Sequence, residues 1–190
     1  MQPIILASQS PRRKMLLEWA NISFEVIVSD TDESFPLSMP INDIPVFIAS
    51  NKAKAVKQII ASQFPQHENK KIVAADTIVV LENKILGKPV DKPAAIASLL
   101  SLSGKTHQVI TGVVILNGVN EYSFSETTSV TFNHLSLEQI EYYVENYKPY
   151  DKAGGYAIQE WIGVVGIQSI QGDFYNVMGL PVSKLLQKMK

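Results

Sequence analysis

The segment 6–13 places two serines and two arginines where an apolar run meets the start of a helix. Ser10 can cap that helix, and Pro11 fits its first turn. The first N–H groups of a helix attract anions, and the guanidinium groups of Arg12 and Arg13 match the geometry of phosphate oxygens. The segment therefore indicates a phosphate site. The alternative is that the Ser-Pro pair only starts a helix and both arginines are solvated.

A carboxylate, Asp76, lies inside an apolar segment with the character of a strand. Burying it costs free energy unless it is paired, hydrogen-bonded or bound to a metal. A functional role is therefore favoured over the alternative, a strand-end turn formed with Thr77. The acidic loop 29–33 offers further oxygen ligands for a hard cation in Asp30, Asp32 and Glu33, although such loops are commonly just solvated.

Two further segments carry polar groups beside residues that control the backbone. Lys88 stands between Gly87 and Pro89, a placement that can aim its ammonium group. The segment 151–159 contains opposite charges, two glycines that allow close backbone approach, and the amide of Gln159, which both donates and accepts hydrogen bonds. Each segment alone is unremarkable, and together they favour a binding site.

Several other motifs fail. Gly104-Lys105-Thr106 resembles the end of a P-loop, but Leu99 stands where the earlier glycine is required, and a helix precedes it. The three histidines are too dispersed for a zinc site, and no G-x-S-x-G elbow of a serine hydrolase is present. Three tyrosines on one predicted helix, at 142, 143 and 147, favour packing over base stacking.

The elements that must position these residues follow from hydrophobic periodicity and turn residues. We predict helices after Pro11, over 46–64 and 93–102, after a capping box that starts at Ser136, and from Pro181 onward. We predict strands over 3–7, 22–28 and 71–81, the last interrupted at residues 76–77, and two hairpins, 109–132 turning at Asn117-Gly118 and 164–178 turning at Gly172-Asp173. Strands alternate with helices first and hairpins follow, which predicts an α/β fold with a mixed sheet.

Composition bounds the function. The chain has 190 residues, 46% of them hydrophobic, with 17 basic and 18 acidic side chains for a net charge of -1. Such a balance provides no global field for nucleic acid or an anionic membrane. Cysteine is absent, which excludes disulfides and suits a reducing compartment. With no apolar segment of membrane-spanning length, we predict a cytoplasmic protein without a membrane partner.

Seven ordered blocks of residues resemble the Maf family of nucleoside triphosphate pyrophosphatases over essentially the whole chain. They are Leu6-Ala-Ser-Gln-Ser-Pro-Arg-Arg13, Asn51-Lys-Ala53, Ala75-Asp-Thr-Ile-Val79, Leu86-Gly-Lys-Pro89, Ser103-Gly-Lys-Thr-His-Gln-Val109 with Thr111-Gly112, Asp151-Lys-Ala-Gly-Gly-Tyr-Ala-Ile-Gln159 and Gly179-Leu-Pro181. The branch that acts on dTTP and UTP is the most similar, because its specificity positions match Arg13, Thr77 and Gln159. The branch that acts on 7-methyl-GTP typically differs at these blocks.

The resemblance implies a single domain over 1–190 with two lobes around a cleft, an elongated mixed sheet and flanking helices, related to the ITPase-like superfamily. It also implies a divalent cation, Mg²⁺ or Mn²⁺, and often a homodimer. The implied site comprises catalytic Asp76, Lys88 and Lys52, substrate-binding Ser8, Arg12, Arg13, Thr77 and Gln159, and the metal ligands Glu33 and Asp76. Only the resemblance selects Glu33 and Lys52 over their neighbours.

The implied reaction is hydrolysis between the α and β phosphoryl groups of dTTP and UTP, which gives a nucleoside monophosphate and pyrophosphate. Cationic side chains would stabilise the departing charge, and Asp76, helped by Glu33, would hold the ion and orient or deprotonate water. Gln159 could pair with a uracil or thymine edge. Two alternatives stay open, a pyrophosphatase for modified or noncanonical nucleotides and a nucleotide-binding regulatory protein without catalysis.

Overall fold

The computed structural model describes residues 2–189, and its contacts divide the chain into two compact units. Unit 1 consists of Met1–Asp76, Thr111–Glu126 and Gly179–Lys190, and unit 2 of Thr77–Ile110 and Thr127–Met178. The boundary falls between two predicted site residues, Asp76 and Thr77, which are neighbours in one strand. The predicted organisation as a single domain with two lobes stays a prediction.

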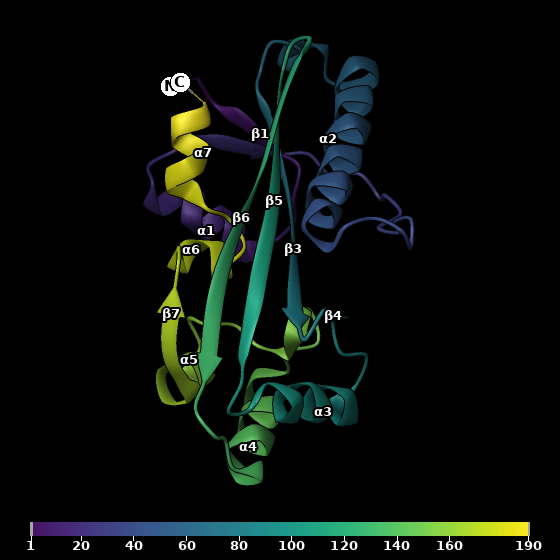
Figure 1. Ribbon diagram of the computed structural model, residues 1–190. Coiled ribbons are helices and arrows are strands. Elements are labelled where there is room, and N and C mark those ends of the chain that lie inside the picture. The colour runs from purple at the N-terminus through teal and green to yellow at the C-terminus, as the bar shows by residue number, and fades with distance from the viewer. Residues whose placement is uncertain (1, 190) are drawn as a thin grey trace. The chain divides into compact units, whose positions relative to one another are not determined.

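The strands form a seven-stranded mixed sheet in the order β2-β1-β3-β5-β6-β7, with β4 paired to β3 (Figure 1). They are β1 (Ile4–Leu6), β2 (Phe24–Val26), β3 (Ile72–Leu81), β4 (Lys84–Leu86), β5 (Thr106–Asn117), β6 (Asn120–Phe132) and β7 (Ile167–Gln171). β1 runs parallel to β2 and β3, whereas β4 is antiparallel to β3 and β7 to β6. The predicted α/β class with a mixed sheet and flanking helices is confirmed.

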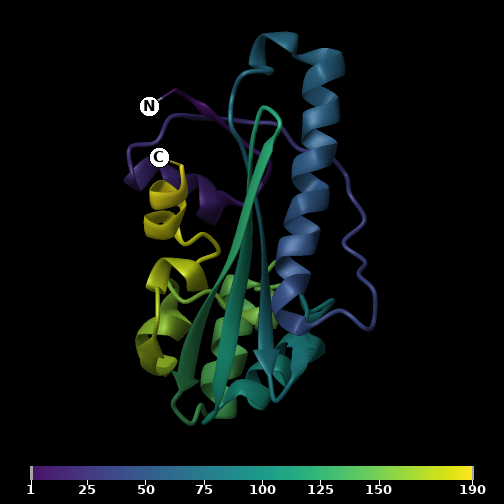
Figure 2. The same ribbon diagram turned by 45° about the horizontal axis from the view of Figure 1, so that its top comes forward.

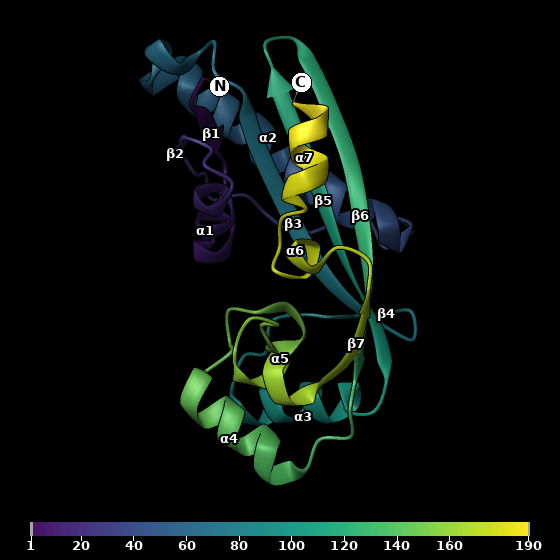
Figure 3. The ribbon, with the colours of Figure 1, turned by 90° about the vertical axis from the view of Figure 1, so that its left-hand side faces the viewer.

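Unit 1 packs three helices around its strands, α1 (Pro11–Trp19), α2 (Ile44–Gln63) and α7 (Val182–Lys188). α2 and α7 lie on opposite sides of these strands (Figures 1 and 3). The apolar stripe of α2 is buried against β1, β3 and β5, in a core that includes Ala49, Ala53, Val56, Ile60, Ile5, Ile72, Ala74 and Val114. Two short 3₁₀ turns flank α2, η1 (Ile41–Asp43) and η2 (Pro65–His67).

Unit 2 contains α3 (Lys92–Leu102), α4 (Leu137–Tyr147), the 3₁₀ turn η3 (Ala153–Gly155), α5 (Trp161–Gly166) and α6 (Phe174–Val177). α3 packs against α4 (Figure 3) and also against η3. The predicted capping box at the start of α4 is confirmed, because Ser136 and Gln139 bond each other's backbone N–H groups. Lys148 ends α4 in the left-handed conformation, just before Pro149.

The structure corrects three local predictions. β3 is continuous through Asp76 and Thr77 instead of being interrupted there. Ser10 occupies the N-cap of α1, but its side chain makes no capping bond. The second hairpin is wrong, because residues 161–166 form α5 and only β7 pairs with β6. Asp173 then accepts a hydrogen bond from the N–H of Tyr175 and starts α6 where a return strand was expected.

A buried aromatic cluster in unit 2 contains a histidine. His107 is 2% exposed, and its Nε2 lies 2.6 Å from the hydroxyl of Tyr156, while its ring stacks on Phe132. Its other ring nitrogen, Nδ1, is buried without a hydrogen-bond partner. Burial lowers the pKa of His107 from 6.5 to about 4, so the ring is neutral in the folded protein near pH 7.

Across residues 2–189, no helix is both long enough and apolar enough to cross a bilayer.

We expect Gly112→Ala to destabilise the protein by about 1–3 kcal/mol, the usual cost of overpacking. A Cβ at Gly112, in β5, would lie 2.2 Å from the backbone nitrogen of Val46 and 2.3 Å from the carbonyl carbon of Pro45, so the start of α2 would have to shift. Urea unfolding followed by circular dichroism measures the loss. Gly87→Ala is the matched control, since a methyl there meets nothing within 4 Å. Equal stability of the two variants would contradict this packing.

We expect His107 to make stability depend on pH. The unfolded chain binds a proton at this ring below about pH 6.5, whereas the folded chain binds it only near pH 4. His107 therefore contributes fully to the free energy of unfolding at neutral pH. This contribution is lost as the pH falls from about 6.5 to 4, by at most about 1.4 kcal/mol per pH unit. His107→Gln should flatten the pH dependence of urea unfolding in this window relative to the wild type. His134→Gln, at an exposed histidine, should retain the pH dependence of the wild type. An equal slope of unfolding free energy against pH in all three proteins would disprove this account.

Candidate active site

A lysine in unit 1 joins two carboxylates from different segments. The Nζ of Lys52 lies 2.6 Å from a carboxylate oxygen of Glu33 and 2.7 Å from one of Asp76. Lys52 comes from α2, Asp76 from β3, and Glu33 from the loop that follows β2. The side chains of Lys52 and Asp76 are 18% and 13% exposed, so both are shielded from water yet reachable. The cost of placing Asp76 inside a strand is offset by this ion pair.

Position on α2 distinguishes Lys52 from the other lysines of that helix. Lys54 pairs with Glu121, and Lys57 donates to the carbonyl of Gly118. Both partners lie at the turn end of the β5–β6 hairpin, which runs beside α2 in unit 1 (Figure 2). The helical pattern alone could not separate these lysines, because which one faces the carboxylates depends on where β3 packs.

Arg13 is buried by the same packing that builds α1. Its Nη1 donates to the hydroxyl of Ser8 at 3.0 Å, and its Nε donates to the carbonyl of Gly179 at 2.8 Å. The hydroxyl of Ser8 also accepts a hydrogen bond from the backbone N–H of Ser10, the N-cap residue of α1, and so fixes the backbone just before the helix. Gly179 has a φ of 110°, a conformation that favours glycine. This carbonyl is a site contact that the sequence analysis did not predict.

The electrostatic environment of Arg13 links it to the two carboxylates. Burial lowers the pKa of Arg13, and the neighbouring charge of Arg12 lowers it further, whereas Asp76 and Glu33 raise it. The structure therefore brings six predicted site residues together within unit 1, namely Ser8, Arg12, Arg13, Glu33, Lys52 and Asp76. Segments that are far apart in the sequence supply them.

The donor set in this cluster fits a hard divalent cation. Two carboxylates, Glu33 and Asp76, already converge on one positive charge, the ammonium of Lys52. Among the described residues, no group of three or more histidine, cysteine or acidic side chains is placed to hold a metal. Mg²⁺ commonly uses one or two carboxylates and completes its shell with water and substrate phosphate, so two are sufficient.

Unit 2 carries the other predicted site residues. Thr77 is partly buried in β3, whereas Lys88 and Gln159 are exposed. The segment around Lys88 is tied to the glycine loop, because the N–H of Gly154 donates to the carbonyl of Gly87 at 3.0 Å. The hydroxyl of Ser98, on α3, holds the carbonyl of Gly154 at 2.8 Å. Lys88 and the loop that carries Gln159 therefore share one framework within unit 2.

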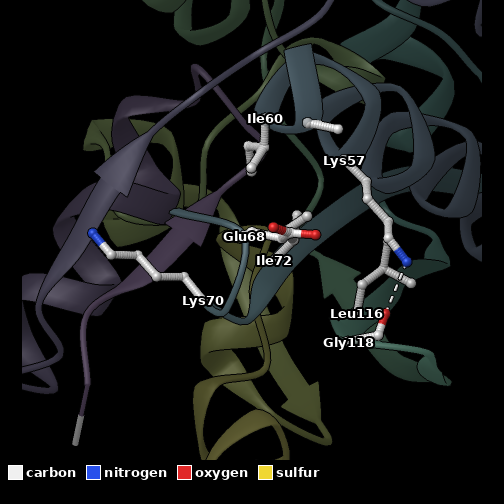
Figure 4. A pocket seen from close by; sticks show the side chains of 8 residues that line it. Lys57, Ile60, Glu68, Lys70, Ile72, Leu116 and Gly118 are labelled. Atoms are coloured by element: carbon white, nitrogen blue, oxygen red, sulfur yellow. Dashed lines mark hydrogen bonds between the residues drawn. The ribbon is translucent and has the colours of Figure 1, made fainter. Parts of the chain in front are cut away.

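A small hollow in unit 1 shares no residue with the charged cluster. Its floor is apolar, with Ile60, Ile72 and Leu116, and lysine and glutamate side chains surround it (Figure 4). Lys57 at its rim is already bonded to the carbonyl of Gly118. We therefore assign the hollow no role in the candidate site.

Comparison with known proteins finds relatives that match nearly the whole chain. A protein named dTTP/UTP pyrophosphatase from Parabacteroides distasonis is 49% identical over 98% of this chain and 94% of its own length. Proteins of the same name from Cytophaga hutchinsonii and Porphyromonas gingivalis are 50% and 46% identical over 98% of this chain, and over 83% and 92% of their own lengths. A solved structure, the Ham1 protein of Staphylococcus aureus, is 16% identical, covers 69% of this chain and 72% of its own, and has a TM-score of 0.45.

The family model described as Maf-like protein matches residues 3–190, nearly the whole chain. It spans the charged cluster of unit 1 as well as Thr77, Lys88 and Gln159. On this match and on the identity to its relatives, the chain belongs to the Maf-like protein family.

Proposed function

We propose that this chain hydrolyses dTTP and UTP to the nucleoside monophosphate and pyrophosphate, assisted by Mg²⁺ or Mn²⁺. The observation that carries the proposal is the convergence of Glu33 and Asp76 on the ammonium of Lys52, beside the buried Arg13. Fixed cations next to carboxylates that can bind a metal suit a triphosphate. The choice of dTTP and UTP rests on the names of the relatives at 46–50% identity.

In this mechanism the cationic side chains bind the triphosphate. Ser8 already accepts hydrogen bonds from Arg13 and from the N–H of Ser10, so the proton of its hydroxyl can be donated to a phosphate oxygen. Arg12 and Arg13 add fork-shaped donors, and Lys52 and Lys88 add ammonium charge. These groups stabilise the negative charge that develops on the departing pyrophosphate.

Water adds across the anhydride between the α and β phosphoryl groups, and Asp76 orients that water and accepts its proton. Glu33 and Asp76 would hold the divalent cation, which when bound neutralises phosphate charge and makes water a better nucleophile. In the chain alone, Lys52 separates the two carboxylates and relieves their repulsion. No covalent intermediate with the protein is needed.

The remaining residues select the base. The amide of Gln159 offers a donor and an acceptor, which match the adjacent carbonyl and N–H of uracil and thymine. Thr77 directly follows Asp76 in β3, and in this proposal it tunes the selection of the base. The cytoplasmic location, the homodimer and the lack of nucleic-acid and membrane partners stay predictions.

We expect the purified wild-type protein to release pyrophosphate from UTP and dTTP faster than from GTP. This release should stop when EDTA removes the metal.

Asp76→Asn should lower kcat by about 10²-fold or more, because it removes the proton acceptor and a metal ligand. Asp43→Asn, at an exposed carboxylate, serves as the control. Near-normal turnover of UTP by Asp76→Asn at saturating metal would show that the catalytic assignment is wrong.

Lys88→Ala should lower kcat about tenfold or more and leave thermal unfolding unchanged, since Lys88 is exposed and contributes charge rather than packing. The measurements are steady-state kinetics with UTP and a thermal melt of the same sample. Lys84→Ala removes a nearby exposed ammonium from β4 and should keep full activity. A matched loss of kcat and of thermal stability in Lys88→Ala would instead indicate a structural role.

A further inference from the structure

A tyrosine hydroxyl in unit 2 forms hydrogen bonds with residues that precede and follow Gln159 in the sequence. Tyr143 lies on α4 and is fully buried. Its oxygen accepts a hydrogen bond from the backbone N–H of Ala157 at 3.1 Å and donates one to a carboxylate oxygen of Glu160. Ala157 stands two residues before Gln159 and Glu160 one residue after it, so a single oxygen atom spans the segment.

The same short segment is fixed by further contacts. The N–H of Glu160 donates to the carbonyl of Ala157 at 3.1 Å, which closes a turn around Gln159. Lys152 is buried and lies 3.6 Å from the second carboxylate oxygen of Glu160. Ile158 is 5% exposed, whereas Gln159 itself is exposed. The backbone of Gln159 is therefore held on both sides while its amide faces solvent.

We propose that Tyr143 is a positioning residue that fixes the backbone of Gln159 for recognition of the base. The inference rests on the proposed function, in which the Gln159 amide pairs with uracil or thymine. An amide on a fixed backbone loses less conformational freedom when it binds, so holding the segment strengthens the pairing. The hydroxyl is what matters, because phenylalanine would fill the same core volume without bonding Ala157 or Glu160.

The alternative is a core tyrosine that only satisfies its neighbours. Tyr143→Phe removes one oxygen and leaves the N–H of Ala157 without this partner, which costs stability in either case. Stability alone therefore cannot decide between the two roles. The ratio of kcat/KM for UTP to that for CTP can, since these substrates share sugar and triphosphate and differ only in the base.

The test compares the wild type with Tyr143→Phe, Gln159→Ala and the double variant. Tyr143→Phe should lower the UTP/CTP ratio about tenfold, mainly through KM for UTP, a loss of about 1.4 kcal/mol. The double variant should show no further fall beyond Gln159→Ala, because Tyr143 acts through Gln159. Amide hydrogen exchange of residues 155–162 should rise in Tyr143→Phe. Tyr142→Phe, at the half-exposed tyrosine that precedes Tyr143 on α4, should change neither the UTP/CTP ratio nor the hydrogen exchange of these residues.

The outcomes separate the inference from the proposed function. If the wild type has equal kcat/KM for CTP and UTP, the proposed base selectivity is overturned, and the inference is overturned with it. A selective wild type whose ratio survives Tyr143→Phe overturns the inference alone, as does a fall in ratio that simply adds to that of Gln159→Ala.

If Tyr143→Phe does not fold, Glu160→Ala tests the same connection from its partly exposed end. It should lower the ratio, while Glu160→Gln, which still accepts from the tyrosine, should restore it. Equal ratios in both variants would overturn the inference.

Discussion

The ion pairs of Lys52 with Glu33 and Asp76 are the interaction on which the candidate site depends. Asp76 lies inside a strand whose other residues are largely buried, and a carboxylate there is tolerated only with a partner. α2 supplies that partner because its apolar stripe packs on β1, β3 and β5 and leaves Lys52 facing the strand. The core of unit 1 therefore positions the charges, and the charges carry the proposed chemistry.

Much of the fold follows from local patterns. The β5–β6 hairpin, the capping box at Ser136 and helix α2 were all predicted, because each is set by residues close together in the sequence. The hairpin turns at Gly118-Val119, one residue beyond the predicted Asn117-Gly118. The prediction over 164–178 failed where the periodicity was ambiguous. The segment 161–166 is short and apolar, so its pattern fits a strand as well as a helix. The packing of α5 in unit 2 and the cap at Asp173 favour helices here.

The site was predictable in its residues and not in its contacts. Asp76 and the arginines attract notice from their types and neighbours, whereas Glu33 and Lys52 were selected by family resemblance. The helical pattern did not predict that Arg13 is buried, since two adjacent arginines at the start of a helix are often solvated. Its acceptor, the carbonyl of Gly179, is 166 residues away in the sequence, and no local pattern announces such a contact. Likewise, Tyr143 was expected to pack, and only its bonds to Ala157 and Glu160 distinguish it from a core aromatic.

The bond from Arg13 to Gly179 has a consequence for how the protein is made. Gly179 begins the last segment of unit 1, which also contains α7 and the carbonyl of Met189 that Lys71 bonds. Chains emerge from the ribosome starting at the N-terminus, so α1 is synthesised long before its arginine can meet this acceptor. The bond that orients the guanidinium of Arg13 therefore forms only after the last segment of unit 1 has been synthesised.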